Sequence, residues 1–267
     1  MLYALLVLGA LGFVASAGLG VASKKLAIKM DPRIERLSEL LPGANCGACG
    51  FAGCSNLAEA VINEGAVVTR CPVCDETTLS TICKELKLEA GARVKMVVRI
   101  MCSGGDNKVG RSFDYKGVRD CKAAVLIAGG DKNCPFGCLG YGTCIEVCPF
   151  GALSEGPSGI PVVDDDACTG CGKCVAACPK DVMRLVPLSN GVHVMCNSKA
   201  SGKEVRDVCP VGCIGCGLCE KVCPFEAIEI VDNLAVIDYQ KCMQCGLCVS
   251  KCPQKTISNE RAFAAVA

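Results

Sequence analysis

The stretch Cys213–Pro224, "CIGCGLCEKVCP", holds four cysteines and ends on a proline. The same pattern returns at 168–179, "CTGCGKCVAACP", and at 242–253, "CMQCGLCVSKCP". In each run the spacing C-x2-C-x2-C brings three thiolates around one point, and C-P follows after three more residues. This spacing decides the fold, because loops that carry cysteines in this pattern are expected to fold around bound metal.

Cysteine use narrows the class of protein. The chain has 267 residues with 26 cysteines but only one histidine, His193. Such a density suits a disulfide scaffold or a metal protein, and spacing distinguishes them. Zinc sites use one cysteine pair from each of two segments, often with histidine, whereas the three runs match the bacterial ferredoxin pattern for [4Fe–4S] clusters. We therefore predict iron–sulfur clusters, with structural zinc or disulfides as the alternatives.

The two C-terminal runs predict a two-cluster ferredoxin module. In such modules the fourth cysteine of each run binds the other cluster, and the intervening segment reads as a helical turn and two strands around Asp232-Asn233. The predicted ligands are Cys213, Cys216, Cys219 and Cys252 for one cluster, and Cys242, Cys245, Cys248 and Cys223 for the other.

A second module precedes this one, with one altered half. Its first run, "CPFGCLGYGTCIEVCP" at 134–149, has wider spacing and extra glycines, which let the backbone loop more widely. The predicted ligands are Cys134, Cys138, Cys144 and Cys178 for one cluster, and Cys168, Cys171, Cys174 and Cys148 for the other.

Nearer the N-terminus, "NCGACGFAGC" at 45–54 precedes Cys71-Pro72. The glycines allow backbone N–H groups to approach a cluster, so this motif predicts a fifth [4Fe–4S] site, with zinc as the alternative. Cys74 and Cys83 lie in a helix-like stretch and are expected to be packed structural thiols. The predicted ligands are Cys46, Cys49, Cys54 and Cys71.

A sixth cluster is suggested by an internal repeat. The segment "VVRIMCSGG" with "YKGVRDC" resembles "GVHVMCNSK" with "GKEVRDVC", and the two halves flank the first module. We expect one interrupted domain in which the two strands pair side by side. Its predicted ligands are Cys102, Cys121, Cys196 and Cys209. The alternative is two buried thiol pairs that remain from an old duplication.

Residues 1–23 carry no charged side chain and are long enough to span a bilayer. A cleaved signal peptide is the alternative, but its basic n-region is missing. Lys24, Lys25 and Lys29 follow the apolar run and predict a single-pass anchor with the clusters on the cytoplasmic side of the cell membrane. Ile34, Leu37 and Leu40 then predict a short amphipathic helix.

Other functions find little support in the sequence. There is no Gly-rich dinucleotide motif after a strand, no P-loop and no catalytic triad pattern. The formal charge is +1, and each bound cluster with its four thiolates adds negative charge, so we expect no nucleic-acid partner. His193, in an expected strand, is interpreted as a packed or surface residue and not as a ligand.

In the order of these motifs the chain resembles the B subunits of Rnf electron-transport complexes, in their longer, cluster-rich form from anaerobes. The resemblance covers essentially the whole chain: the anchor, "GANCGACGFAGC", "CPFGCLGYGTCIEVCPFGAL", "CTGCGKCVAACPK", "CNS" and two regular runs. It implies a membrane complex that oxidises reduced ferredoxin, reduces NAD⁺ and exports Na⁺ or H⁺. Flavin and NAD sites are then expected on other subunits.

The predicted function is an electron-transfer subunit that accepts electrons from ferredoxin and catalyses nothing alone, with the cluster of Cys46, Cys49, Cys54 and Cys71 as its exit. The alternatives are a polyferredoxin-like subunit of a hydrogenase or formate dehydrogenase, and a zinc-stapled membrane adaptor.

The predicted fold class is α+β. The expected division is a transmembrane anchor (1–23), a juxtamembrane helix and linker (24–43), a four-cysteine domain (44–90), an interrupted strand–helix domain (91–130 with 188–212), two ferredoxin modules (131–187 and 211–259) and a tail (260–267).

Overall fold

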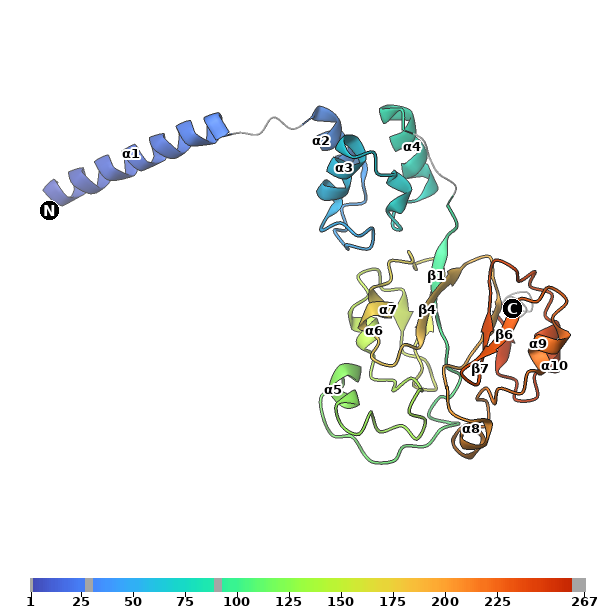
Figure 1. Cartoon of the computed structure of the whole chain (residues 1–267). Coiled ribbons are helices and arrows are strands. Elements are labelled where there is room, and N and C mark those ends of the chain that lie inside the picture. The colour runs from blue at the N-terminus through green and yellow to red at the C-terminus, as the bar shows by residue number, and fades with distance from the viewer. Residues whose placement is uncertain (1, 27–30, 89–92, 261–267) are drawn as a thin grey trace.

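The computed structural model describes the chain apart from residues 1, 27–30, 89–92 and 261–267. The predicted tail 260–267, except Glu260, lies outside the described residues, as do 27–30 of the predicted linker. Figure 1 shows three helices, α2 to α4, gathered on one side, from which β1 leads into a body of short strands and helices.

The N-terminal helix α1 (Leu2–Leu26) forms where the anchor is predicted and lies apart from the other elements in Figure 1. Its side chains Leu11, Phe13 and Leu19 are exposed. Among the described residues, no helix meets the combined length and hydropathy that a bilayer crossing requires. The membrane anchor therefore stays a prediction.

A small helical unit follows, built from α2 (Pro32–Leu40), α3 (Cys54–Asn63), a 3₁₀ turn η1 (Val68–Arg70) and α4 (Glu76–Leu86). Asp31 caps α2 by accepting from the Arg33 N–H at 2.8 Å. Apolar residues at helical spacing form one core; its fully buried members are Leu37, Leu57, Ala58, Val68 and Ile82.

The first ferredoxin module is completed by a strand from outside the predicted module. Strand β1 (Met96–Ile100) pairs antiparallel with β4 (Met183–Pro187), so the pair encloses everything between them. Within it lie α5 (Cys121–Val125), α6 (Thr143–Glu146), the pair β2 (Leu153–Ser154) and β3 (Val162–Val163), and α7 (Lys173–Ala177).

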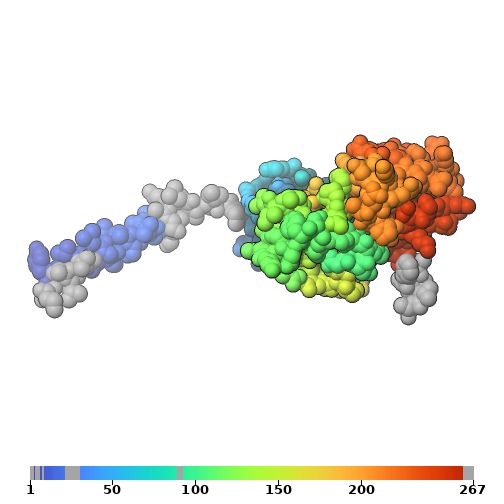
Figure 2. All heavy atoms as spheres, turned by 90° about the horizontal axis from the view of Figure 1, so that it is seen from below, coloured from blue at the N-terminus to red at the C-terminus, as the bar shows by residue number. Residues whose placement is uncertain are grey.

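The second module repeats this plan. Strand β5 (Val192–Val194) pairs antiparallel with β8 (Ile257–Asn259), and β6 (Ile228–Val231) pairs with β7 (Leu234–Ile237). Its helices are α8 (Gly202–Val208), α9 (Leu218–Val222) and α10 (Leu247–Lys251). Seen from below in Figure 2, the two modules form one continuous body.

The expected side-by-side pairing of the two repeat strands is wrong. Each strand instead forms a two-stranded antiparallel sheet with the last strand of a different module, β1 with β4 and β5 with β8. The strands meet just past their ends, where the Ser103 N–H donates to the Met195 carbonyl at 3.1 Å. This single link still brings Cys102 and Cys196 to one place.

Candidate metal centres

Every one of the 26 cysteines is a free thiol, and four cavities are each lined by four of them. Two belong to the second module and contain the quartets that the ferredoxin spacing predicts. Cavity A is lined by Cys213, Cys216, Cys219 and Cys252. Cavity B is lined by Cys223, Cys242, Cys245 and Cys248.

The other two cavities differ from the expected grouping, because Cys121 and Cys134 exchange places. Cavity C is lined by Cys121, Cys138, Cys144 and Cys178. Cavity D is lined by Cys102, Cys134, Cys196 and Cys209.

The surroundings of the thiols agree with this exchange. Burial raises the pKa of Cys144 to about 11, and the neighbouring Cys121 and Cys178 add to the rise. Burial likewise raises the pKa of Cys134, to which Cys102 and Cys209 contribute. Each thiol is thus influenced by the other cysteines of its own cavity.

The reason for the exchange is visible when the two modules are placed in register. "CLGYGTCIEVCP" (138–149) matches "CIGCGLCEKVCP" (213–224) position by position, with Tyr141 where the second run has Cys216. The first module therefore lacks one cysteine of its own run. Cys121 takes that place at cavity C, held at the start of α5, where its N–H donates to the Thr143 hydroxyl at 2.7 Å.

The same register explains cavity D. "CPFGC" (134–138) is equivalent to "CPVGC" (209–213), and both form the same turn, with Gly137 N–H bonded to the Cys134 carbonyl and Gly212 N–H to that of Cys209. Cys134 thus corresponds to Cys209, and not to a member of the cluster-binding run. This repeat is the signal in the sequence that identifies the exchange.

Backbone N–H groups point at several of the sulfurs. Ser198 N–H donates to Cys196 Sγ at 3.4 Å, and Thr256 N–H donates to Cys252 Sγ at 3.3 Å. Such N–H···S bonds stabilise the negative charge of thiolates bound to iron. The linings of the four cavities contain no histidine or carboxylate, so the donor set fits [4Fe–4S] clusters.

The thiols line the cavity walls and do not meet at a point. Among the residues that the structure describes, no group of three or more His, Cys, Asp or Glu side chains lies close enough to hold a single metal ion.

The predicted ligands Cys148, Cys168, Cys171 and Cys174 are also close together in the first module. Burial raises the pKa of Cys174 to about 12, with Cys171, Cys144 and Cys168 adding to the rise; Cys148 packs against the same core.

In the helical unit, Cys49, Cys54 and Cys71 pack on one core, while Cys46 is half-buried on the preceding loop. Cys74 is buried and Cys83 packs beside it. The Cys74 thiol donates to Cys71, which lowers the pKa of Cys71 to about 6. Cys71 is therefore the better thiolate of this pair.

Polar pairs with one buried member occupy equivalent positions in the two modules. Arg99 on β1 donates from Nη2 to Asp165 Oδ2 at 2.7 Å. In the second module the equivalent residues are His193 on β5 and Tyr239, whose hydroxyl lies 2.8 Å from His193 Nδ1. His193 is fully buried, in agreement with a packing role.

Comparison with protein families gives three kinds of match. A family of Fe-S cluster domains matches residues 41–73. Two families described as 4Fe-4S dicluster domain match residues 132–183 and, twice, residues 167–227 and 212–256.

Three of the similar proteins each match most of this chain. The chain is 46% identical to the B subunit of the ion-translocating oxidoreductase complex of Methanosarcina acetivorans, over 94% of this chain and 95% of the relative. It is 44% identical to the B subunit of the Na⁺-translocating ferredoxin:NAD⁺ oxidoreductase complex of Acetobacterium woodii, over 88% and 71%. It is 42% identical to the proton-translocating counterpart of Clostridium ljungdahlii, over 88% and 83%. The chain therefore belongs to the family of B subunits of ion-translocating ferredoxin:NAD⁺ oxidoreductase (Rnf) complexes.

Proposed function

We propose that this chain is the iron–sulfur subunit that takes electrons from reduced ferredoxin and passes them into a membrane complex that reduces NAD⁺ and exports Na⁺ or H⁺. The observation that carries the proposal is the set of four cavities, each lined by four cysteines. When bound, a [4Fe–4S] cluster accepts and releases electrons one at a time. The cysteines hold the clusters as ligands, and surrounding amides and burial adjust their potentials.

Six clusters are proposed. The ligand sets of four of them are the cysteines of cavities A, B, C and D. The other two sets are Cys148, Cys168, Cys171 and Cys174, and Cys46, Cys49, Cys54 and Cys71.

Contacts between neighbouring sets support an ordered route. Cys174 lies near Cys144 of cavity C, the Cys138 N–H of cavity C donates to Cys102 of cavity D, and Cys196 of cavity D adjoins Cys213 of cavity A. Electrons can thus pass through both modules by short steps. The cluster of Cys46, Cys49, Cys54 and Cys71 is the proposed exit.

Residues 1–23 are proposed to attach the chain to the cell membrane, with the clusters on the cytoplasmic side. Deleting them should yield a cluster-containing protein that ferredoxin still reduces but that no longer supports NAD⁺ reduction by membranes. A protein that remains in the membrane after this deletion would exclude the anchor.

The decisive experiment is iron analysis of the full chain, purified without oxygen. Six clusters need about 24 Fe per chain at four Fe each, and the visible absorption should bleach when reduced ferredoxin is added. Replacing Cys102 and Cys196 together by serine should remove about four Fe. Zinc in place of iron, or absorption that ferredoxin leaves unchanged, would reject the electron-transfer function.

Two rivals remain testable. A polyferredoxin-like subunit of a hydrogenase or formate dehydrogenase would co-purify with those activities and without NAD⁺ reduction. A zinc-stapled adaptor would contain no iron.

A further inference from the structure

Cavity D draws its cysteines from both halves of the repeat. Cys102 and Cys134 come from the first module, and Cys196 and Cys209 occupy the equivalent positions of the second. The cavity is therefore shared between two modules that otherwise form separate two-stranded sheets.

Each module touches this shared cavity through the same peptide N–H. The Cys138 N–H donates to Cys102 Sγ at 3.4 Å, and the backbone of its equivalent, Cys213, bonds to the Cys196 thiol. Cys138 and Cys213 also line the next cavities, C and A. One residue on either side thus joins cavity D to a neighbouring cluster site.

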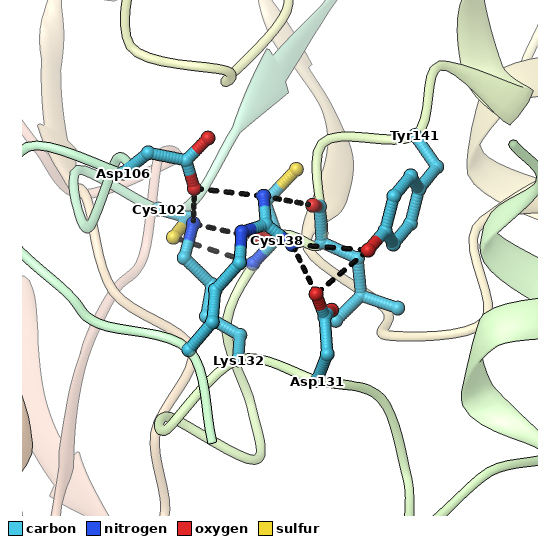
Figure 3. Close-up of polar contacts among 8 residues, drawn as sticks. Cys102, Asp106, Asp131, Lys132, Cys138 and Tyr141 are labelled. Carbon is cyan, nitrogen blue, oxygen red and sulfur yellow. Dashed lines mark hydrogen bonds and ion pairs between the residues drawn. The ribbon is translucent and has the colours of Figure 1, made fainter. Parts of the chain in front are cut away.

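The charges beside these two contacts are unequal. Lys132 has a side chain only 1% exposed, and its Nζ donates to the Cys138 carbonyl at 3.0 Å (Figure 3). The equivalent position of the second module holds Asp207, which is exposed on α8. The first module therefore has a buried cation where the second module has an exposed carboxylate.

A polar network keeps Lys132 in place. Asp106 Oδ1 lies 3.5 Å from Lys132 Nζ and 2.9 Å from Arg111 Nη2. Arg111 also pairs with buried Asp131, which accepts from the Tyr141 hydroxyl at 2.7 Å (Figure 3). Tyr141, the residue that replaces a cysteine in this run, is thus part of the support for Lys132.

The charge of Lys132 acts on Cys138. The Lys132 Nζ lies 3.0 Å from the Cys138 carbonyl oxygen and is shielded from solvent, so its positive charge is close to the wall of cavity C. A buried cation favours added negative charge nearby, and a cluster becomes more negative when it is reduced.

We propose that cavity D is the electron bridge between the two modules, and that Lys132 is a positioning residue that favours reduction at cavity C over cavity A. The inference rests on the proposed function. Each hop moves one electron: the site it leaves is oxidised by one electron, the site it enters is reduced by one, and no bond forms or breaks. Starting from reduced ferredoxin, electrons then pass from the second module through cavity D to the first.

The test is a redox titration of the full chain followed by electron paramagnetic resonance. The signal of cavity C is identified by its disappearance in Cys144→Ser. In Lys132→Met the ratio of reduced to oxidised cluster at cavity C should fall about tenfold at a fixed potential, which equals a midpoint about 59 mV lower for one electron.

Two further variants separate charge from structure. Asp106→Asn removes a partly exposed carboxylate, leaves Lys132 unpaired and should raise the same midpoint. Lys199→Met removes an exposed lysine of the second module, which is paired with Asp232 at 3.3 Å. This variant should leave the midpoint potential of cavity C unchanged. A purely structural role of Lys132 would not move the midpoint in opposite directions in the first two variants.

Iron content and complete reduction by dithionite are measured on every sample. If the unmodified chain contains no iron or is not reduced by dithionite, the proposed function is wrong. If the clusters are present but the cavity C midpoint is unchanged, or shifts the same way in both variants, the bias by Lys132 is wrong. If Lys132→Met does not fold, Asp106→Asn alone decides.

Discussion

The two ferredoxin modules share one plan and differ at a few equivalent positions. In both modules a preceding strand pairs with the last strand, β1 with β4 and β5 with β8. In both, the cysteine of a Cys-Pro turn lines cavity D. The second module keeps Cys216 and closes cavity A with cysteines of its own two runs. The first has Tyr141 at that position and recruits Cys121 from a separate helix. The comparison shows that a cysteine lining a cavity can come from another segment while the cavity keeps its place.

The largest effect is expected when the cysteine that takes the place of Cys216 in the first module, Cys121, is removed. Cys121→Ser should remove about four Fe, one whole cluster, because the run cannot supply a fourth thiolate. Adding Tyr141→Cys restores the cysteine pattern of the second module, so the double variant should regain the iron. Iron analysis and the resonance signal of cavity C measure this.

Cys83→Ser is the control, since Cys83 packs against the core of the helical unit but belongs to none of the predicted ligand sets, and it should keep all its iron. Full iron in Cys121→Ser alone would mean that cavity C is closed by another residue.

The second effect concerns the tight turn that both modules need. Gly140 and Gly215 are equivalent, with φ of 81° and 62°, and an added Cβ would lie 2.5 Å from the Gly159 carbonyl oxygen and 2.8 Å from that of Asn233. Substituting alanine at either position should lower the free energy of unfolding by about 2–4 kcal/mol, through backbone strain and a clash with main chain.

Gly151→Ala separates the two causes, because Gly151 has φ of 63° with open space around it. It should cost about 1 kcal/mol. Anaerobic urea denaturation measures all three variants, and equal costs at 140 and 151 would show that the close approach has no energetic weight.

The smallest effect is a pH dependence that only the second module should show. Burial lowers the pKa of His193 to about 4, and the nearby Arg99 adds to the fall. A histidine with a lowered folded-state pKa binds its proton more readily when unfolded, so stability falls as the pH drops below about 6.5. From pH 7.5 to 5.5 the chain should lose about 1 kcal/mol more than His193→Gln.

The equivalent Arg99 stays charged over this range, so the first module should contribute no such slope. If the free energy of unfolding changes with pH in the same way in the unmodified chain and in His193→Gln, the pKa of His193 does not differ between the folded and unfolded states.

The sequence predicts much of this architecture where its repeats are regular. The quartets of cavities A and B follow from the spacing of the two C-terminal runs, because regular runs place their four cysteines around each cavity from nearby residues. The spacing places Cys121 and Cys134 in each other's sites, because the wider run, taken alone, starts at Cys134. Spacing alone does not distinguish a ligand from an equivalent residue that faces another cavity.

The strand pairing could not be predicted from the sequence for a different reason. The similarity of 97–102 to 191–196 indicates a duplication, but partners in a sheet depend on which edge each strand reaches. Lys132 gives no signal either, since one lysine becomes notable only when its side chain is found buried beside Cys138.

Cavity D also determines the order in which the chain can be assembled. Its cysteines are spread from Cys102 to Cys209, so at ribosomal speed the last emerges roughly 5 to 20 seconds after the first. The regular runs of the second module emerge later still, yet each closes over a short segment. During synthesis, iron can therefore be delivered to local sites before the shared one exists, and a chain that stops before Cys209 should carry clusters of the first module but neither cavity D nor the runs of the second module. Such an unfinished subunit could not receive electrons through cavity D.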